Sequence, residues 1–463
     1  MLGFFRTTDP YRLIWLFLLM ITISLPWLIS WPGITLPELR SFMIGEKVSE
    51  GFALYTEVVD SAPPLAAWFY GFCEWAMGKA TIVRHFLALV VLFLAGSYYG
   101  LMLISKKAFP ESTLLPALIF CITVLMSFDM LALTAELPAF VLLMAALKLL
   151  MDEVAFREQR DETILRLGLV TGLASLFVFS YAIFFPGILA LLLLFTRTSL
   201  RRLFLMLFGF CLPHALLAGY YYYNASFAVL AERFYLPGFF MPATWLINSR
   251  SLLLLLAVPL IFLFMSLFVL NRNAHLTKYQ SQLLQIMLLW LVLAFIHFLI
   301  APDKRPQALL PAIPPLAFIL THHFLLIKRK FAGLHLWFYL AGLVATAHLA
   351  QSGVFPVKYD KLIVRDDGLY KDKRLLDLTG SCNVYLRNTP APPLLDIHLT
   401  RQILARPNTF ESIILINHLF STDPPEMVID PENYLAPFFQ RIPALAGQYR
   451  RSGSVWIKVA KTG

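Results

Sequence analysis

The 463-residue sequence is poor in charged residues and in cysteine. Charged side chains make up 14% of it, whereas soluble domains usually carry about 25%. The four cysteines are far apart and show neither metal-ligand spacing nor a disulfide framework; they are Cys73, Cys121, Cys211 and Cys382. No internal repeat or low-complexity tract stands out. The sequence therefore does not read as a soluble domain, a disulfide-stapled scaffold or a repeat protein.

Hydrophobic residues are abundant instead, at 59% of the chain, with a mean hydropathy of +0.71. They form long continuous runs rather than alternating with polar residues, which favours an all-α polytopic membrane bundle over a membrane barrel. The first run follows a short, mildly basic start and contains Pro26 and Trp27 where a signal peptide would have a small-residue cleavage site. We therefore interpret it as a retained span.

The apolar runs predict about eleven membrane spans. Several are shorter than the roughly 20 residues that a straight crossing needs. The expected spans are 12–31, 82–104, 112–128, 136–151, 164–180, 183–196, 203–222, 251–270, 282–300, 309–327 and 333–350. The aromatic stretch 63–78 is too short to cross, so we expect it to form a helix at the membrane interface.

The net charge of +10 lies largely in short loops between the spans, which argues against nucleic acid as a partner. The loops on one side are richer in lysine and arginine; Lys106-Lys107 and Lys328-Arg329-Lys330 are examples. The richer side is expected to be cytoplasmic. Eleven spans then place the N-terminus inside, and the first long loop, 32–81, and the C-terminal segment outside.

The composition changes after the last span. We expect two domains: a polytopic transmembrane domain over 1–351 and a small extracytoplasmic α/β domain over 352–463. The second contains strand-like and helix-like pieces. The strand-like pieces are Leu375–Leu378, Asn383–Leu386, Met427–Asp430 and Val455–Ala460, and the helix-like ones are 394–405 and 434–446.

The first long loop is acidic. Its five carboxylates are opposed only by Arg40 and Lys47; they are Glu38, Glu46, Glu50, Glu57 and Asp60. We interpret Glu46 and Glu50 as a solvated helix face, because they are four residues apart with a lysine between them. Glu38, where the chain leaves the membrane, and Asp60, before a Pro-Pro pair, are better candidates for acid/base chemistry.

Other ionisable residues fall at the outer ends of spans, where an unpaired charge is costly and function is the first hypothesis. They are Arg84, His85, Asp129, Glu136, Lys304 and Arg305, and the polar but uncharged Gln307 follows the last pair. Each also has a structural alternative. Arg84 would snorkel to headgroups, the two carboxylates would cap a helical hairpin, and the basic pair would anchor a span end. No metal site is predicted, because the adjacent His322 and His323 point to different helix faces.

Three regions resemble GT-C glycosyltransferases, the polytopic class that includes protein O-mannosyltransferases and lipid A aminoarabinose transferases. The first runs through Pro37-Glu38, Gly51, Tyr55, Asp60 and Pro63-Pro64-Leu65; the second is Arg84; the third is the basic, proline-rich segment Lys304–Pro315. The class commonly has Asp-Glu where this chain has Pro37-Glu38, so the residue usually credited as the base is replaced by proline.

The resemblance implies a membrane glycosyltransferase that moves a sugar from a polyprenyl-phosphate-linked donor to a glycan, lipid or protein acceptor outside a bacterial inner membrane. Glu38 is the first choice for the catalytic base and Asp60 the second. The remaining polar residues would bind substrate: Arg40, Glu57, Arg84, His85, Asp129, Glu136, Lys304, Arg305 and Gln307. No cofactor is assigned, and dependence on a divalent metal ion is left open.

Two other functions are alternatives to the glycosyltransferase. The Pro37 departure supports an inactive GT-C-like scaffold or envelope assembly factor. A lipid or glycan transporter is the third alternative, although a transporter should have polar residues or broken helices at mid-membrane. The charges of this chain cluster at the ends of its spans instead.

Overall fold

The computed structural model describes residues 2–7, 9–155, 160–196, 198–240, 242–273, 276–366, 368 and 370–459. The chain forms two compact units, each built from three stretches of sequence. The first unit comprises Met1–Pro32, Ala80–Leu217 and Pro242–Leu362, and the second comprises Gly33–Lys79, Ala218–Met241 and Ile363–Gly463. The acidic loop thus belongs to the same unit as the C-terminal segment. A domain boundary at 351/352 stays a prediction.

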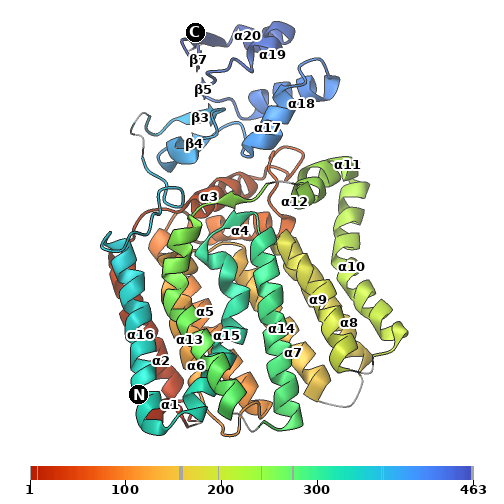
Figure 1. Cartoon of the computed structure of the whole chain (residues 1–463). Helices are drawn as coiled ribbons and strands as arrows, with labels where there is room; N and C mark the ends of the chain where they lie inside the picture. Colours follow the sequence, from red (N-terminus) through yellow and green to blue (C-terminus); the bar gives the residue numbers. More distant parts are fainter. Residues whose placement is uncertain are drawn as a thin grey trace. The chain divides into compact units, whose positions relative to one another are not determined.

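The first unit is a bundle of long helices that run side by side (Figure 1). Its helices are α1 (Leu2–Phe5), α2 (Arg12–Ile29), α5 (Thr81–Ser105), α6 (Leu115–Thr123), α7 (Glu136–Ala155), α8 (Asp161–Phe177), α9 (Phe184–Phe195), most of α10 (Leu200–Tyr223), α13 (Ser249–Asn273), α14 (Lys278–Ile300), α15 (Ile313–Leu326) and α16 (Arg329–Gln351). Short 3₁₀ turns are η1 (Val124–Met126), η2 (Phe128–Leu131), η3 (Phe179–Ile183) and η5 (Pro306–Ala312), and β1 (Thr244–Trp245) pairs with β2 (Asp303–Lys304).

Seven of the described helical segments are long and apolar enough to cross a membrane. They are Arg12–Ile29, Thr81–Ser105, Leu200–Tyr223, Ser249–Arg272, Lys278–Ile300, Pro306–Leu326 and Lys330–Gln351. Each of the eleven expected spans coincides with helical structure, but the others are shorter or more polar than a full span. Pro306–Leu326 is the most enclosed of the seven, with 83% of its apolar window buried. Its polar N-terminal end is therefore surrounded by other helices.

Small residues let two helices of the first unit approach closely. A Cβ atom on Gly168 of α8 would lie 2.1 Å from the Met206 carbonyl oxygen of α10, and one on Gly209 would lie 2.4 Å from the Leu165 carbonyl oxygen. A larger side chain at either position would push the backbones apart. Such small-residue contacts are typical of helices that pack within a bilayer.

The second unit contains two helices from the acidic-loop region and an α/β part. Its helices are α3 (Leu36–Ser49), α4 (Pro64–Met77), α11 (Phe227–Leu230), the π-turn η4 (Ala231–Tyr235), α12 (Leu236–Phe240), η6 (Cys382–Leu386), α17 (Ile397–Leu404), α18 (Phe410–Thr422), α19 (Ala436–Arg441) and α20 (Pro443–Ala446). The stretch 63–78, expected to be helical, forms α4. Helices α3 and α4 pack tightly, because a Cβ on Gly45 would lie 2.6 Å from the Tyr70 carbonyl oxygen.

A five-stranded mixed sheet, in the order β4-β3-β5-β7-β6, organises the α/β part. The strands are β3 (Arg374–Asp377), β4 (Thr389–Pro390), β5 (Met427–Ile429), β6 (Tyr449–Ser452) and β7 (Val455–Lys458). β3 pairs in parallel with β4 and β5, whereas β7 is antiparallel to β5 and β6. Three expected strand-like pieces overlap β3, β5 and β7; Ala460, the last residue of one, lies outside the described residues. The expected strand Asn383–Leu386 is wrong, since this stretch is the 3₁₀ turn η6.

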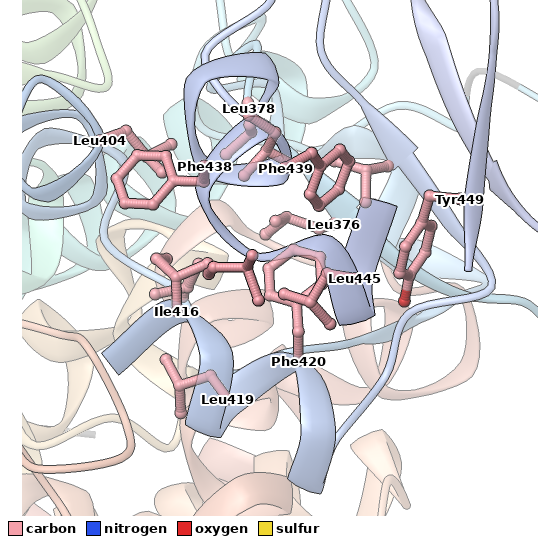
Figure 2. Packing of buried hydrophobic residues seen from close by; sticks show 14 of the residues in the cluster. Leu376, Leu378, Leu404, Ile416, Leu419, Phe420, Phe438, Phe439, Leu445 and Tyr449 are labelled. Carbon is pink, nitrogen blue, oxygen red and sulfur yellow. The ribbon is translucent and has the colours of Figure 1, made fainter. Parts of the chain in front are cut away.

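The core of this α/β part lies between the sheet and its helices (Figure 2). Figure 2 shows Phe420, Phe438 and Phe439 packed among leucines from the strands and helices. One member of the cluster comes from far away in the sequence. Val59 of the acidic loop is fully buried in it and pairs with Leu394 in an isolated β-bridge. The acidic loop is therefore part of this core rather than a free surface loop.

Candidate active site

The loop between α3 and α4 is closed on itself by short-range hydrogen bonds. Glu57 Oε2 accepts a hydrogen bond of 2.7 Å from the Ala53 N–H, and the buried Tyr55 hydroxyl donates to the Ala62 carbonyl at 2.6 Å. Tyr55 has φ +68°, a left-handed conformation that a tyrosine rarely adopts. Such a backbone persists only where its surroundings impose it. These contacts thus hold the loop in one conformation.

Val59 fixes the next part of the loop. Its side chain is buried in the α/β core, its N–H donates to the Pro393 carbonyl at 2.9 Å, and its carbonyl accepts from the N–H groups of Leu395 and Asp396 at 3.0 and 3.1 Å. The residue after it, Asp60, is held in place by these contacts. The position of Asp60 is therefore set by backbone pairing between two distant parts of the sequence.

Asp60 is half-buried, and its environment favours the protonated form. Burial and then the neighbouring Asp396 carboxylate raise the pKa of Asp60 to about 7, against the opposing effects of the Ala62 N–H and the Arg40 guanidinium. The Ala62 N–H donates to Asp60 Oδ1 at 2.7 Å. A carboxyl group that titrates near neutral pH can accept and release protons under ordinary conditions.

Arg40 of α3 is exposed and faces the same carboxyl group. It lowers the pKa of Asp60 and hydrogen-bonds to the Cys382 thiol of η6. Two of the residues expected to act together, Arg40 and Asp60, are thus neighbours. Glu57, the third expected residue of this loop, is engaged in its closure, and its Oε1 also lies 3.2 Å from Nε2 of His418.

Glu38, the first choice for the base, has a structural role in this arrangement. It is 3% exposed, and its Oε2 accepts hydrogen bonds from the Thr35 N–H at 2.9 Å and the Thr35 hydroxyl at 2.8 Å. Thr35 in turn accepts from the Glu38 N–H, which completes a capping box at the start of α3. One of the two carboxylate oxygens of Glu38, Oε2, is therefore engaged in the cap of α3.

In the first unit, a buried network joins η2 to η5. Arg305 Nη1 donates to Asp129 Oδ1 at 2.9 Å and Nη2 donates to the Thr134 hydroxyl at 3.0 Å. The Gln307 N–H donates to Asp129 Oδ2 at 2.9 Å, and the Thr134 hydroxyl donates to Gln307 Oε1 at 2.7 Å. All four side chains are almost fully buried. Three expected substrate-binding residues, Asp129, Arg305 and Gln307, are therefore brought together.

Lys304 and Glu136 lie close to that network. The Lys304 ammonium group donates to the carbonyls of Phe298, Leu299 and Ala301 at 2.6–2.7 Å, which uses its three donors on the C-terminal end of α14. Glu136 begins α7 and interacts electrostatically with Arg305. Among the described residues, its buried Oε2 has no hydrogen-bond partner. Lys304 therefore stabilises a helix end, while Glu136 interacts with Arg305 and with Tyr181.

Arg84 and His85, at the start of α5, are both 2% exposed. The imidazole ring of His85 stacks on Trp31 with 3.4 Å between ring centroids. Burial excludes the snorkelling alternative for Arg84, since a snorkelling guanidinium would be exposed to headgroups. No group of three or more histidine, cysteine, aspartate or glutamate side chains able to hold a metal ion occurs among the described residues.

Sequence reasoning missed Asp396 as a neighbour of Asp60 and as the hydrogen-bond partner of Ser61. Asp396 precedes α17 and carries the usual signal of an N-cap, which indicates a helix start and nothing more. The backbone pairing of Val59 with residues 393–396 brings the Asp396 side chain to the acidic loop. No local pattern encodes that pairing.

Comparisons with known proteins place these observations beside solved structures. No protein-family model and no curated protein sequence matches the chain. ArnT from Cupriavidus metallidurans, solved with undecaprenyl phosphate, is 16% identical over 73% of this chain with a TM-score of 0.47. The oligosaccharyltransferase AglB from Archaeoglobus fulgidus, solved with an inhibitory peptide and dolichol-phosphate, is 11% identical over 98% of this chain with a TM-score of 0.48.

This chain corresponds to 64% of the length of the ArnT chain and to 75% of the AglB chain. The similarity to both solved chains is distant.

Proposed function

We propose that this protein is an integral-membrane glycosyltransferase that uses Asp60 as its general base. The observation that carries the proposal is the Asp60 carboxyl itself. It is half-buried, its pKa is raised to about 7, and it is fixed in a loop that connects two candidate membrane spans. A base with a pKa near the working pH gives the best balance between being deprotonated and accepting a proton.

The proposed reaction transfers a sugar from a polyprenyl-phosphate carrier to an acceptor hydroxyl or amide outside a bacterial inner membrane, with the N-terminus in the cytoplasm. The acceptor atom bonds to the anomeric carbon while the bond from that carbon to the phosphate oxygen breaks. Asp60 takes the acceptor's proton, and the polyprenyl phosphate leaves as an anion. A long apolar carrier explains why such an enzyme lies in the membrane.

A cation is needed where negative charge grows on the leaving phosphate. We assign this role to Arg40, because it is exposed and faces Asp60. Lys304 and Arg305, the cations first expected there, are occupied by carbonyls of α14 and by Asp129 respectively. Their contribution is then to hold the ends of α14 and η5 in place.

The test is a transfer assay with the full chain in lipid nanodiscs, labelled polyprenyl-phosphate sugars and mixed lipid, glycan and peptide acceptors. We expect Asp60→Asn to lower turnover by about 10²–10⁴-fold, the usual contribution of a general base. Glu411→Gln, which removes an exposed carboxylate of the same unit, is the control and should behave like the wild type. Wild-type turnover by Asp60→Asn would remove Asp60 from the mechanism.

An inactive scaffold or assembly factor is the second candidate. Pro37 replaces the aspartate usual in the class, Glu38 caps a helix, and the Lys304 ammonium group is saturated by carbonyls. A wild-type protein that transfers no sugar from any donor, and that co-purifies with a defined envelope partner, would establish this alternative.

A further inference from the structure

Asp396 lies beside Asp60 and is held there by hydrogen bonds to both of its carboxylate oxygens. The Ser61 hydroxyl donates to Asp396 Oδ2 at 2.6 Å. Asp396 Oδ1 accepts from the N–H groups of His398 and Leu399 at 2.9 and 3.2 Å, so that it caps α17. An acceptor with both oxygens engaged is fixed in position. Asp396 therefore presents a fixed negative charge to the acidic loop.

The backbone adds a second connection between the same two segments. The Val59 carbonyl accepts the Asp396 N–H at 3.1 Å, and the Val59 side chain is buried in the α/β core. Asp60 stands between Val59 and Ser61, the two residues that contact Asp396 or its backbone. A shift of Asp396 would thus move the residues on both sides of Asp60.

We propose that Asp396 is a positioning residue for Asp60, which it orients through Ser61 and beside which it holds a fixed negative charge. The proposal rests on the proposed function, in which Asp60 is the base. It adds a residue from the C-terminal α/β part of the chain to the machinery of the acidic loop. Asp396 itself does not touch the reacting atoms.

The charged and titratable groups that face Asp60 act in opposite directions. Asp396 raises the pKa of Asp60, because two neighbouring negative charges repel each other, and Arg40 lowers it. Tyr55 from the same loop and Cys382 from η6 are the other titratable neighbours. Removal of the negative charge should make Asp60 a stronger acid, and removal of the positive charge should make it a weaker one.

The experiment measures kcat/KM against pH for the full chain in nanodiscs. A base must be deprotonated, so activity should rise as the pH passes through the pKa of Asp60, near 7. Asp396→Asn should move this rise to lower pH by about one unit, and Arg40→Gln should move it to higher pH. Glu411→Gln should leave it in place. Asparagine is as good an N-cap as aspartate, so Asp396→Asn tests the charge with α17 still capped.

Ser61→Ala tests the orienting contact separately. It removes the hydrogen bond to Asp396 but no charge, so kcat should fall while the pH of the rise changes little. Thermal unfolding of each variant checks that the fold is retained. If Asp396→Asn unfolds, Asp396→Ser provides the same loss of charge with another good N-cap. An unchanged pH profile in a folded Asp396 variant would overturn the proposal.

A second readout keeps this inference separate from the proposed function. The infrared band of the protonated Asp60 carboxyl, assigned by its loss in Asp60→Asn, can be titrated without any substrate. A titration of Asp60 that shifts down in Asp396→Asn, in a protein that transfers no sugar, would uphold the coupling and reject the enzyme. A band that does not shift in an active enzyme would reject the coupling and leave the enzyme standing.

Discussion

Loss of Arg305 should destabilise the protein rather than weaken a substrate contact. Arg305 is 3% exposed, and its guanidinium donates to Asp129 and to the Thr134 hydroxyl. Arg305→Leu would remove the guanidinium that neutralises the fully buried Asp129 carboxylate, while the hydrogen bond from the Gln307 N–H to Asp129 would remain. Breaking a buried ion pair by removing one partner typically costs about 3–5 kcal/mol. We expect a loss of stability of this size.

The free energy of unfolding is measured by denaturant titration of the full chain in mixed micelles. Arg166→Leu is the matched control, because Arg166 forms an exposed ion pair with Glu162 one helical turn away on α8. Exposed pairs of this kind contribute about 0.5 kcal/mol or less. Adding Asp129→Asn to Arg305→Leu removes the stranded charge, so the double variant should regain part of the lost stability.

An opposite outcome would change the assignment of Arg305. If it binds the donor phosphate, Arg305→Leu should raise the KM for the lipid-linked sugar and leave the unfolding free energy within about 0.5 kcal/mol of the wild type. That pattern would refute the structural role argued here. It would also require Asp129 to be stabilised by other donors once Arg305 is gone.

Three further predictions concern buried polar groups. Glu38→Gln should keep the capping box with Thr35 and unfold like the wild type, whereas Glu38→Ala should lower the free energy of unfolding by about 1 kcal/mol. If a stable Glu38→Gln protein lost most of its transfer activity, Glu38 would again be the candidate base. Lys304→Met should cost about 2–3 kcal/mol, because a charged donor to three carbonyls is lost, and a change in donor KM without that cost would contradict it. Lys47→Met should lower stability in the same titration, but by less than the about 3–5 kcal/mol of a buried charge left without any partner, because Arg374 still pairs with Asp423; unchanged stability would show that the Lys47–Asp423 pair is not needed.

The helical bundle could be predicted from the sequence because its signal is local. Continuous apolar runs must form helices in a bilayer, and every expected span coincides with helical structure. The strands of the C-terminal segment are harder to predict from local sequence. Asn383–Leu386 has a strand-like composition, yet it forms η6, where Tyr385 is buried and its hydroxyl accepts a hydrogen bond from the Asp377 N–H at 2.8 Å. A tertiary contact decided the conformation there.

The candidate site, like the strands, could be predicted only in part from local sequence. Glu38 directly follows Pro37, and Asp60 lies three residues before Pro63, so both are acidic residues near the ends of one loop. What separates them is their partners. Thr35, three residues before Glu38, forms a capping box with it at the start of α3. This spacing of a threonine and a glutamate is a local sequence pattern. Asp60 acquires its neutral-range pKa from burial and from Asp396, which the sequence places far away. The sequence alone therefore could not identify Asp60 as the better candidate base, because the Asp396 charge that raises its pKa is brought close by the fold.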